Sequence, residues 1–100
     1  MIHVIAVLTA QPGQRAALLA AFHDNLAAVR AEEGCLEYSL AVPGAKSPAS
    51  FGEEEAVVVV EKWASPAALA AHAAAPHMQA FGARTRELVA SRAIHVLTPA

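Results

Sequence analysis

The sequence is poor in several residue types on which large classes of protein depend. Only one cysteine occurs in 100 residues, which excludes an intrachain disulfide and is typical of a reducing compartment. Charged residues make up 16%, and the seven lysines and arginines are scattered, so the basic patch of a nucleic-acid-binding protein is missing. No apolar run is long enough to cross a bilayer, and no signal peptide is recognisable. We therefore expect a cytoplasmic protein with no nucleic-acid or membrane partner.

Motifs for common cofactors are also missing. Neither a glycine-rich phosphate loop nor the glycine fingerprint of a dinucleotide-binding fold is present, so no flavin or nicotinamide is expected. His72 and His77 are five residues apart, whereas a helical metal pair prefers a spacing of four. No cysteine or acidic residue close to them in the sequence completes a ligand set. The sequence predicts neither a cofactor nor a metal.

Apolar residues, many of them alanine, make up 56% of the chain. Their spacing changes along the chain between that of strands and that of helices. Residues 1–100 suffice for one domain with one core. The patterns predict strands at 1–9, 35–42, 56–63 and 93–98, a helix from Gln14 that Gly34 ends, a loop at 43–55, and helical pieces at 66–74 and 76–89. This β-α-β-β-α-β order predicts an α+β, ferredoxin-like antiparallel sheet with the helices on one face.

The strand at 56–63 is apolar on both faces. One face carries Glu61 and Trp63 after two valines, and the other carries Ala56, Val58 and Val60. Helices on one side of the sheet leave the second set uncovered, and monomers rarely expose an apolar patch of that size. We therefore expect a homodimer in which a partner sheet covers this face.

Residues 57–81 place the four-valine run, Glu61, Trp63, a Ser65-Pro66 helix start and His72 in a recognisable order. This order resembles the antibiotic biosynthesis monooxygenase family, which includes quinol monooxygenases, and residues 33–38 are similar to the family's helix-to-strand turn. The resemblance implies a dimeric α/β-barrel. It also implies a cofactor-independent monooxygenase that oxidises a quinol or polycyclic phenol with dioxygen.

His72 and Trp63 are the predicted catalytic residues. Small residues surround His72 in the sequence and leave room for a cavity beside its imidazole, and helices at this place in the family commonly bring a histidine to the pocket. Trp63 is expected in the pocket wall, where it stacks on the substrate or donates its indole N–H. The alternatives are a surface or core histidine and a purely structural core tryptophan.

Five further residues are predicted to bind substrate: Tyr38, Glu61, His77, Phe81 and Arg84. Tyr38 shares a strand face with large aliphatic residues, so a core position is the alternative. A carboxylate on a central strand must be paired or protonated, and the expected partner of Glu61 is Arg84, Arg86 or a helix N–H.

Two other functions remain open at this point. One is isomerisation of a small oxo-acid or sugar phosphate on the same fold, which a polar pocket with convergent arginines would favour. The other is a non-catalytic dimer that binds a hydrophobic small molecule, which a pocket without a reachable histidine would favour.

Overall fold

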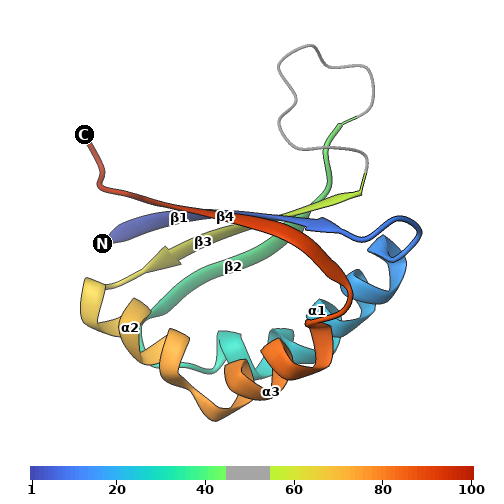
Figure 1. The fold of residues 1–100 in the computed structure, drawn as a ribbon. Helices are drawn as coiled ribbons and strands as arrows, with labels where there is room; N and C mark the ends of the chain where they lie inside the picture. Colours follow the sequence, from blue (N-terminus) through green and yellow to red (C-terminus); the bar gives the residue numbers. More distant parts are fainter. Residues whose placement is uncertain (45–54) are drawn as a thin grey trace.

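The computed structural model describes residues 1–44 and 55–100 and confirms the α+β, ferredoxin-like class (Figure 1). In chain order the elements are β1 (Ile2–Ala10), α1 (Arg15–Arg30), β2 (Cys35–Ala41), β3 (Ala56–Trp63), α2 (Pro66–Ala74), α3 (Pro76–Thr85) and β4 (Val89–Leu97). The sheet is antiparallel with the strand order β2-β3-β1-β4. All three helices lie on the same side of it (Figure 1).

The core lies between the sheet and α1. Every second residue of β1, from Ile2 to Ala10, is buried, as the period of a strand requires. Leu18, Phe22 and Val29 of α1 recur at helical spacing and are buried against these residues.

The connection from β3 to α2 has the predicted helix start. The Ser65 hydroxyl accepts a hydrogen bond from the Ala68 backbone N–H at 3.1 Å, and Pro66 occupies the first helical turn. The turn brings α2 back along the sheet, so side chains of α2 approach those at the end of β3.

Gly34 does not end the first helix, contrary to the prediction. The helix ends at Arg30 with Ala31 as its C-cap, and Gly34 lies in the following turn with φ +83°. A Cβ atom at this position would lie 2.6 Å from the Cβ of Ala68, which is closer than side chains approach. Glycine is therefore required both by its left-handed backbone and by the packing of α2.

The boundary between the last helix and the last strand was also predicted wrongly. We expected a helix to residue 89 and a strand from Ala93, but α3 ends at Thr85 and β4 begins at Val89. Thr85 donates its hydroxyl to the Phe81 carbonyl, and the Leu88 carbonyl accepts the Gln11 backbone N–H. Pairing with β1 thus takes these residues into the sheet despite their helical periodicity.

The edge strand β2 departs from clean alternation at Leu36. The register shifts between Cys35 and Glu37, and Leu36 is 57% exposed instead of sharing the buried face with Tyr38. A bulge places the extra residue outside the ladder. The predicted loop at 43–55 falls mostly outside the described residues.

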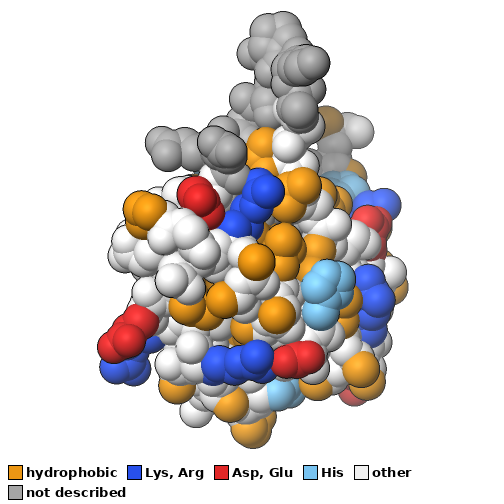
Figure 2. Space-filling model, turned by 90° about the vertical axis from the view of Figure 1, so that its right-hand side faces the viewer, with side chains coloured by type: hydrophobic (Ala, Val, Ile, Leu, Met, Phe, Trp, Pro, Cys, Tyr) orange, Lys and Arg blue, Asp and Glu red, His pale blue; other side chains and the backbone are white. Residues whose placement is uncertain are grey.

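Three of the large exposed apolar side chains lie on β4, and the others are Met1, Leu36 and Val42. Of the residues expected to need a partner, Ala56 and Val58 are already buried within the chain, whereas Val60 is half-buried. Ile94 and Val96 are instead 58% and 56% exposed. On the face shown in Figure 2, apolar side chains gather between interspersed acidic and basic ones. Among the described residues, none of the helices is long and apolar enough to cross a membrane.

Candidate active site

A cavity of about 370 Å³ opens between the sheet and the helices. Its lining is mostly apolar and includes Val4, Ala6, Leu8, Phe22, Leu69, Met78, Phe81 and Ile94. The polar side chains in its wall belong to Tyr38, Glu61, His72, Thr85 and Arg92. An apolar cavity with a few convergent polar groups is typical of a small-molecule site.

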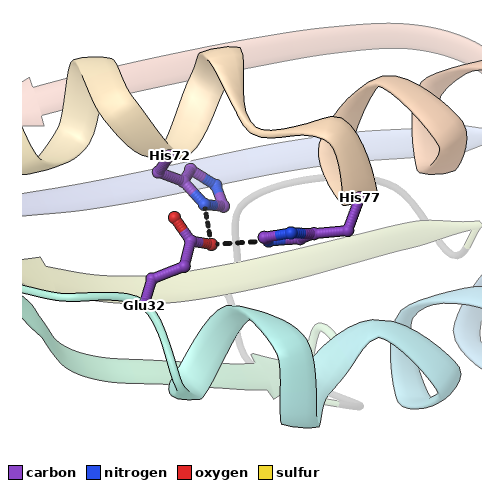
Figure 3. A group of neighbouring side chains, drawn as sticks. All are labelled: Glu32, His72 and His77. Carbon is purple, nitrogen blue, oxygen red and sulfur yellow. Dashed lines mark hydrogen bonds and ion pairs between the residues drawn. The ribbon is translucent and has the colours of Figure 1, made fainter.

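His72 is the polar group with the clearest chemical role. Its side chain is buried in the cavity wall, and its Nδ1 lies 2.8 Å from Oε2 of Glu32 (Figure 3). A carboxylate accepts hydrogen bonds, so this contact assigns the proton of the neutral imidazole to Nδ1. Nε2 then carries the lone pair and can serve the cavity as a base.

Two aromatic rings hold the imidazole in place. The Trp63 indole lies 4.5 Å from the His72 ring, centroid to centroid, at 35°, and the Tyr38 ring lies 5.7 Å away at 59°. Trp63 is fully buried. The structure thus places Trp63 beside His72 and outside the cavity lining, where we expected it in the wall.

Glu61 has a different partner from the ones expected. Its Oε1 accepts a hydrogen bond from Nε1 of Trp63 at 2.9 Å, because both side chains point to the same face of β3. Neither Arg84 nor Arg86 pairs with it among the described contacts. Burial raises the pKa of the Glu61 carboxyl, and the hydrogen bond from Trp63 and the charge of His72 oppose this only partly.

Tyr38 is buried next to His72 and lines the cavity. Burial raises the pKa of its phenol, and the nearby Glu61 and Glu32 raise it further. The hydroxyl is therefore a hydrogen-bond donor rather than a base. The guanidinium of Arg30 donates two hydrogen bonds to the Tyr38 carbonyl, at 3.1 and 2.9 Å, and fixes this part of β2 to α1.

Of the other predicted binding residues, Phe81 lines the main cavity and a neighbouring depression, and His77 and Arg84 line the depression alone. The Phe81 ring lies 4.7 Å from that of Phe22. The depression is shallower than the cavity, with a volume of about 190 Å³. Arg84 is exposed there and donates to Asp24 at 2.9 Å. The structure thus places Phe81 with His72 and keeps Arg84 away from it.

Glu32 is a residue beside His72 that the sequence did not reveal. Its Oε2 lies 2.8 Å both from Nδ1 of His72 and from Nε2 of His77 (Figure 3). Glu32 lies 40 and 45 residues before the two histidines in the sequence, so their spacing gives no sign of it. A topological signal was present, because the start of β2 pairs with the end of β3 and brings the preceding turn beside α2.

The lining of the cavity includes exposed side chains of β4. These are Arg92 and Ile94, whereas Tyr38 and Glu61 come from β2 and β3. Arg92 was not predicted as a site residue.

The comparisons with known proteins agree with this fold over almost the whole chain. The family described as antibiotic biosynthesis monooxygenase matches residues 1–84. The Escherichia coli protein named Probable quinol monooxygenase YgiN is 36% identical over 103 aligned residues, covering 99% of this chain and 98% of that protein.

Solved structures give the same result. Rv0793 from Mycobacterium tuberculosis superposes with a TM-score of 0.82 at 30% identity, covering 99% of this chain and 94% of that one. PA3566 from Pseudomonas aeruginosa has a TM-score of 0.83 at 28% identity, with 99% and 93% covered. These relationships support monooxygenase activity. The chain belongs to the antibiotic biosynthesis monooxygenase family.

Proposed function

We propose that this protein is a cofactor-independent monooxygenase that oxidises a hydroquinone-like phenol with dioxygen. The observation that carries the proposal is the orientation of His72 in an apolar cavity. Glu32 engages Nδ1, so Nε2 is left as the base for a phenol proton. The name of YgiN, a relative over nearly the full length, supports a quinol as the substrate class.

The proposed reaction balances without a protein-bound redox group. A hydroquinone and dioxygen give a hydroxyquinone and water, with one oxygen atom entering the ring and the other leaving as water. All four electrons that reduce dioxygen come from the substrate. The protein has only to bind the ring, favour its anion and exclude water.

Ionising the phenol is the step for which the cavity residues are suited. Free phenols have a pKa near 10, so making the phenolate dominant at pH 7 requires about 4 kcal/mol. A hydrogen bond to a charged group contributes roughly 1.5–3 kcal/mol. Protonated His72 and the Tyr38 hydroxyl together supply two such donors.

Glu61 fits the same requirement because of its raised pKa. An ionised carboxylate in the cavity wall would repel a phenolate, and burial already disfavours that state. The raised pKa favours the protonated carboxyl, which does not repel a phenolate and whose Oε1 can keep the hydrogen bond from Trp63. We place Glu61 and Tyr38 in substrate binding, and His72 in proton transfer.

The cavity disfavours the two other candidate functions. An isomerase of sugar phosphates needs convergent cations, and among the described residues Arg92 is the one arginine in the lining. A purely binding role does not require an oriented histidine. The volume of about 370 Å³ is near the lower end of small-molecule sites, which suits a substrate of few rings.

We also propose that the protein is a homodimer that uses β4. Ile94 and Val96 are exposed on the face of the sheet that lines the cavity, and Leu97 is exposed on the other. A second copy packed along this strand would cover that apolar surface and restrict access to the cavity. Light scattering across a dilution series tests this, and a monomer at micromolar concentration contradicts it.

The test of the proposed function is oxygen uptake with a panel of quinols, using protein treated with chelator and checked for flavin. His72→Ala should lower the rate by about 10²–10⁴-fold, as expected for loss of a positioned acid/base group. His23→Ala, which removes an exposed histidine of α1, is the matched control and should retain activity. Full activity in His72→Ala, or uptake equal to autoxidation, contradicts the proposal.

A further inference from the structure

We propose that Glu32, His72 and His77 form a binding site for a divalent transition metal of the zinc class. The three side chains come from the turn after α1, from α2 and from α3, and they converge on one point (Figure 3). Their ligand atoms, one carboxylate oxygen and two imidazole nitrogens, all lie within 4.8 Å of one another.

The break between α2 and α3 makes this convergence possible. On one continuous helix, residues five apart would point about 140° away from each other. Ala75 has extended dihedrals, φ −63° and ψ 142°, and Pro76 starts a new helix. The change of direction turns His77 back toward His72, so both rings reach Oε2 of Glu32.

The donor set suits the metal class. Imidazole nitrogen with carboxylate oxygen is a common ligand set for zinc, and related divalent ions accept it. Around a tetrahedral zinc ion with bonds near 2.0–2.1 Å, ligand atoms are about 3.3 Å apart. The two 2.8 Å contacts to Glu32 would open by about half an ångström. Water would complete the coordination.

The cluster is sheltered but can be reached. The side chains of His72 and Glu32 are 8% and 13% exposed, whereas that of His77 is 29% exposed. His77 also lines the shallow depression beside Asp24 and Asn25, which gives an ion a route from solvent. Sheltered ligands and a route from solvent are what a site with three protein ligands and one water requires.

Metal binding would change what His72 presents to the cavity, a consequence that rests on the proposed function. With Nδ1 bound to the ion, the proton of the neutral ring moves to Nε2. His72 would then donate a hydrogen bond to the cavity and could no longer accept a phenol proton. We therefore expect the ion to inhibit oxidation, and a chelator to restore it.

The binding test uses Zn²⁺ by calorimetry and Co²⁺ by its visible absorption bands, with the complete chain. We expect one saturable ion per chain. His77→Ala should weaken binding by more than the 10–100-fold that loss of an outer-shell partner costs. Glu32→Gln is a second variant, and circular dichroism checks that both remain folded. His23→Ala, which removes an exposed histidine on α1, should bind like the unmodified protein.

The outcomes separate this inference from the proposed function. The metal site is overturned, whatever the activity, if the unmodified protein shows no saturable binding. It is also overturned if His77→Ala and Glu32→Gln bind the ion as tightly as the unmodified protein does. Binding with the expected dependence on the variants supports the site even if no quinol is oxidised. If the protein oxidises a quinol, the proposed inhibition through His72 can be tested separately. Loss of activity with Zn²⁺ in the unmodified protein but not in His77→Ala supports this inhibition. Equal activity of the unmodified protein with and without Zn²⁺ overturns it.

Discussion

The indole of Trp63 lies against the imidazole of His72, with ring centroids 4.5 Å apart and planes inclined by 35°. The indole N–H is bonded to Glu61, so it is not available to a substrate. Trp63 therefore acts on the site by positioning: it supports the His72 ring and satisfies the carboxylate of Glu61. This arrangement differs from the substrate contact that the sequence suggested.

Trp63→Phe should consequently reduce stability more than substrate binding. The phenyl ring still packs against His72, but Glu61 loses its hydrogen-bond donor in a buried place. Leaving a buried acceptor unsatisfied costs about 1–3 kcal/mol. Urea unfolding measures this loss, and steady-state oxygen uptake gives KM. An increased KM with unchanged stability would show that Trp63 contacts the substrate.

Glu32→Gln should lower kcat through His72. An amide can accept the Nδ1–H bond but can also turn its NH₂ group to the ring, and the His72 tautomer is then no longer fixed. We expect a loss of at least tenfold, up to the loss in His72→Ala. Since Glu32 acts through His72, adding Glu32→Gln to His72→Ala should change the rate no further. Additive losses would mean that Glu32 has an independent role.

The sequence was sufficient for the parts of the fold that local chemistry specifies. Ser65 and Pro66 gave the start of α2, and Pro76 gave the start of α3, because capping and the missing proline N–H act within one turn. The end of α3 could not be predicted, since Val89 is drawn into the sheet by pairing with the distant Ala10.

The candidate site, like the fold, was predictable where neighbouring residues specify it and not where distant residues do. The small side chains around His72 indicated a cavity beside it, and the structure has one. Glu32 could not be assigned to it, because its contacts bridge 40 and 45 residues of sequence. Arg84 was expected to bind substrate and to be a possible partner of Glu61, whereas it is exposed and pairs with Asp24 of α1.

Gly34→Ala should be more destabilising than Gly13→Ala, although both glycines have positive φ, +83° and +78°. A left-handed backbone costs a non-glycine residue about 1–2 kcal/mol in each case. Gly13 has no atom within 4 Å of its would-be Cβ, whereas Gly34 faces Ala68 at 2.6 Å. Overpacking adds about 1–3 kcal/mol. Equal unfolding free energies for the two variants would contradict the role of α2 packing.

Glu61→Gln should stabilise the protein increasingly as the pH rises. Burial raises the pKa of Glu61 in the folded state above its ordinary value near 4.5. Between these two pKa values the folded chain binds more protons than the unfolded chain, so the free energy of unfolding falls with increasing pH. Glutamine resembles the protonated form, since its carbonyl can keep the hydrogen bond from Trp63, and it does not titrate.

The measurable quantity is the difference in unfolding free energy between Glu61→Gln and the unmodified protein. Below the ordinary pKa this difference should be constant, because Glu61 of the unmodified protein is protonated in both the folded and the unfolded state. It should then grow by up to about 1.4 kcal/mol per pH unit until the pH passes the folded pKa, and stay constant above it. Groups titrating alike in both proteins cancel, so urea unfolding at a series of pH values isolates Glu61. A difference that is flat or falls with pH would show that Trp63 and His72 outweigh burial and hold the carboxylate ionised.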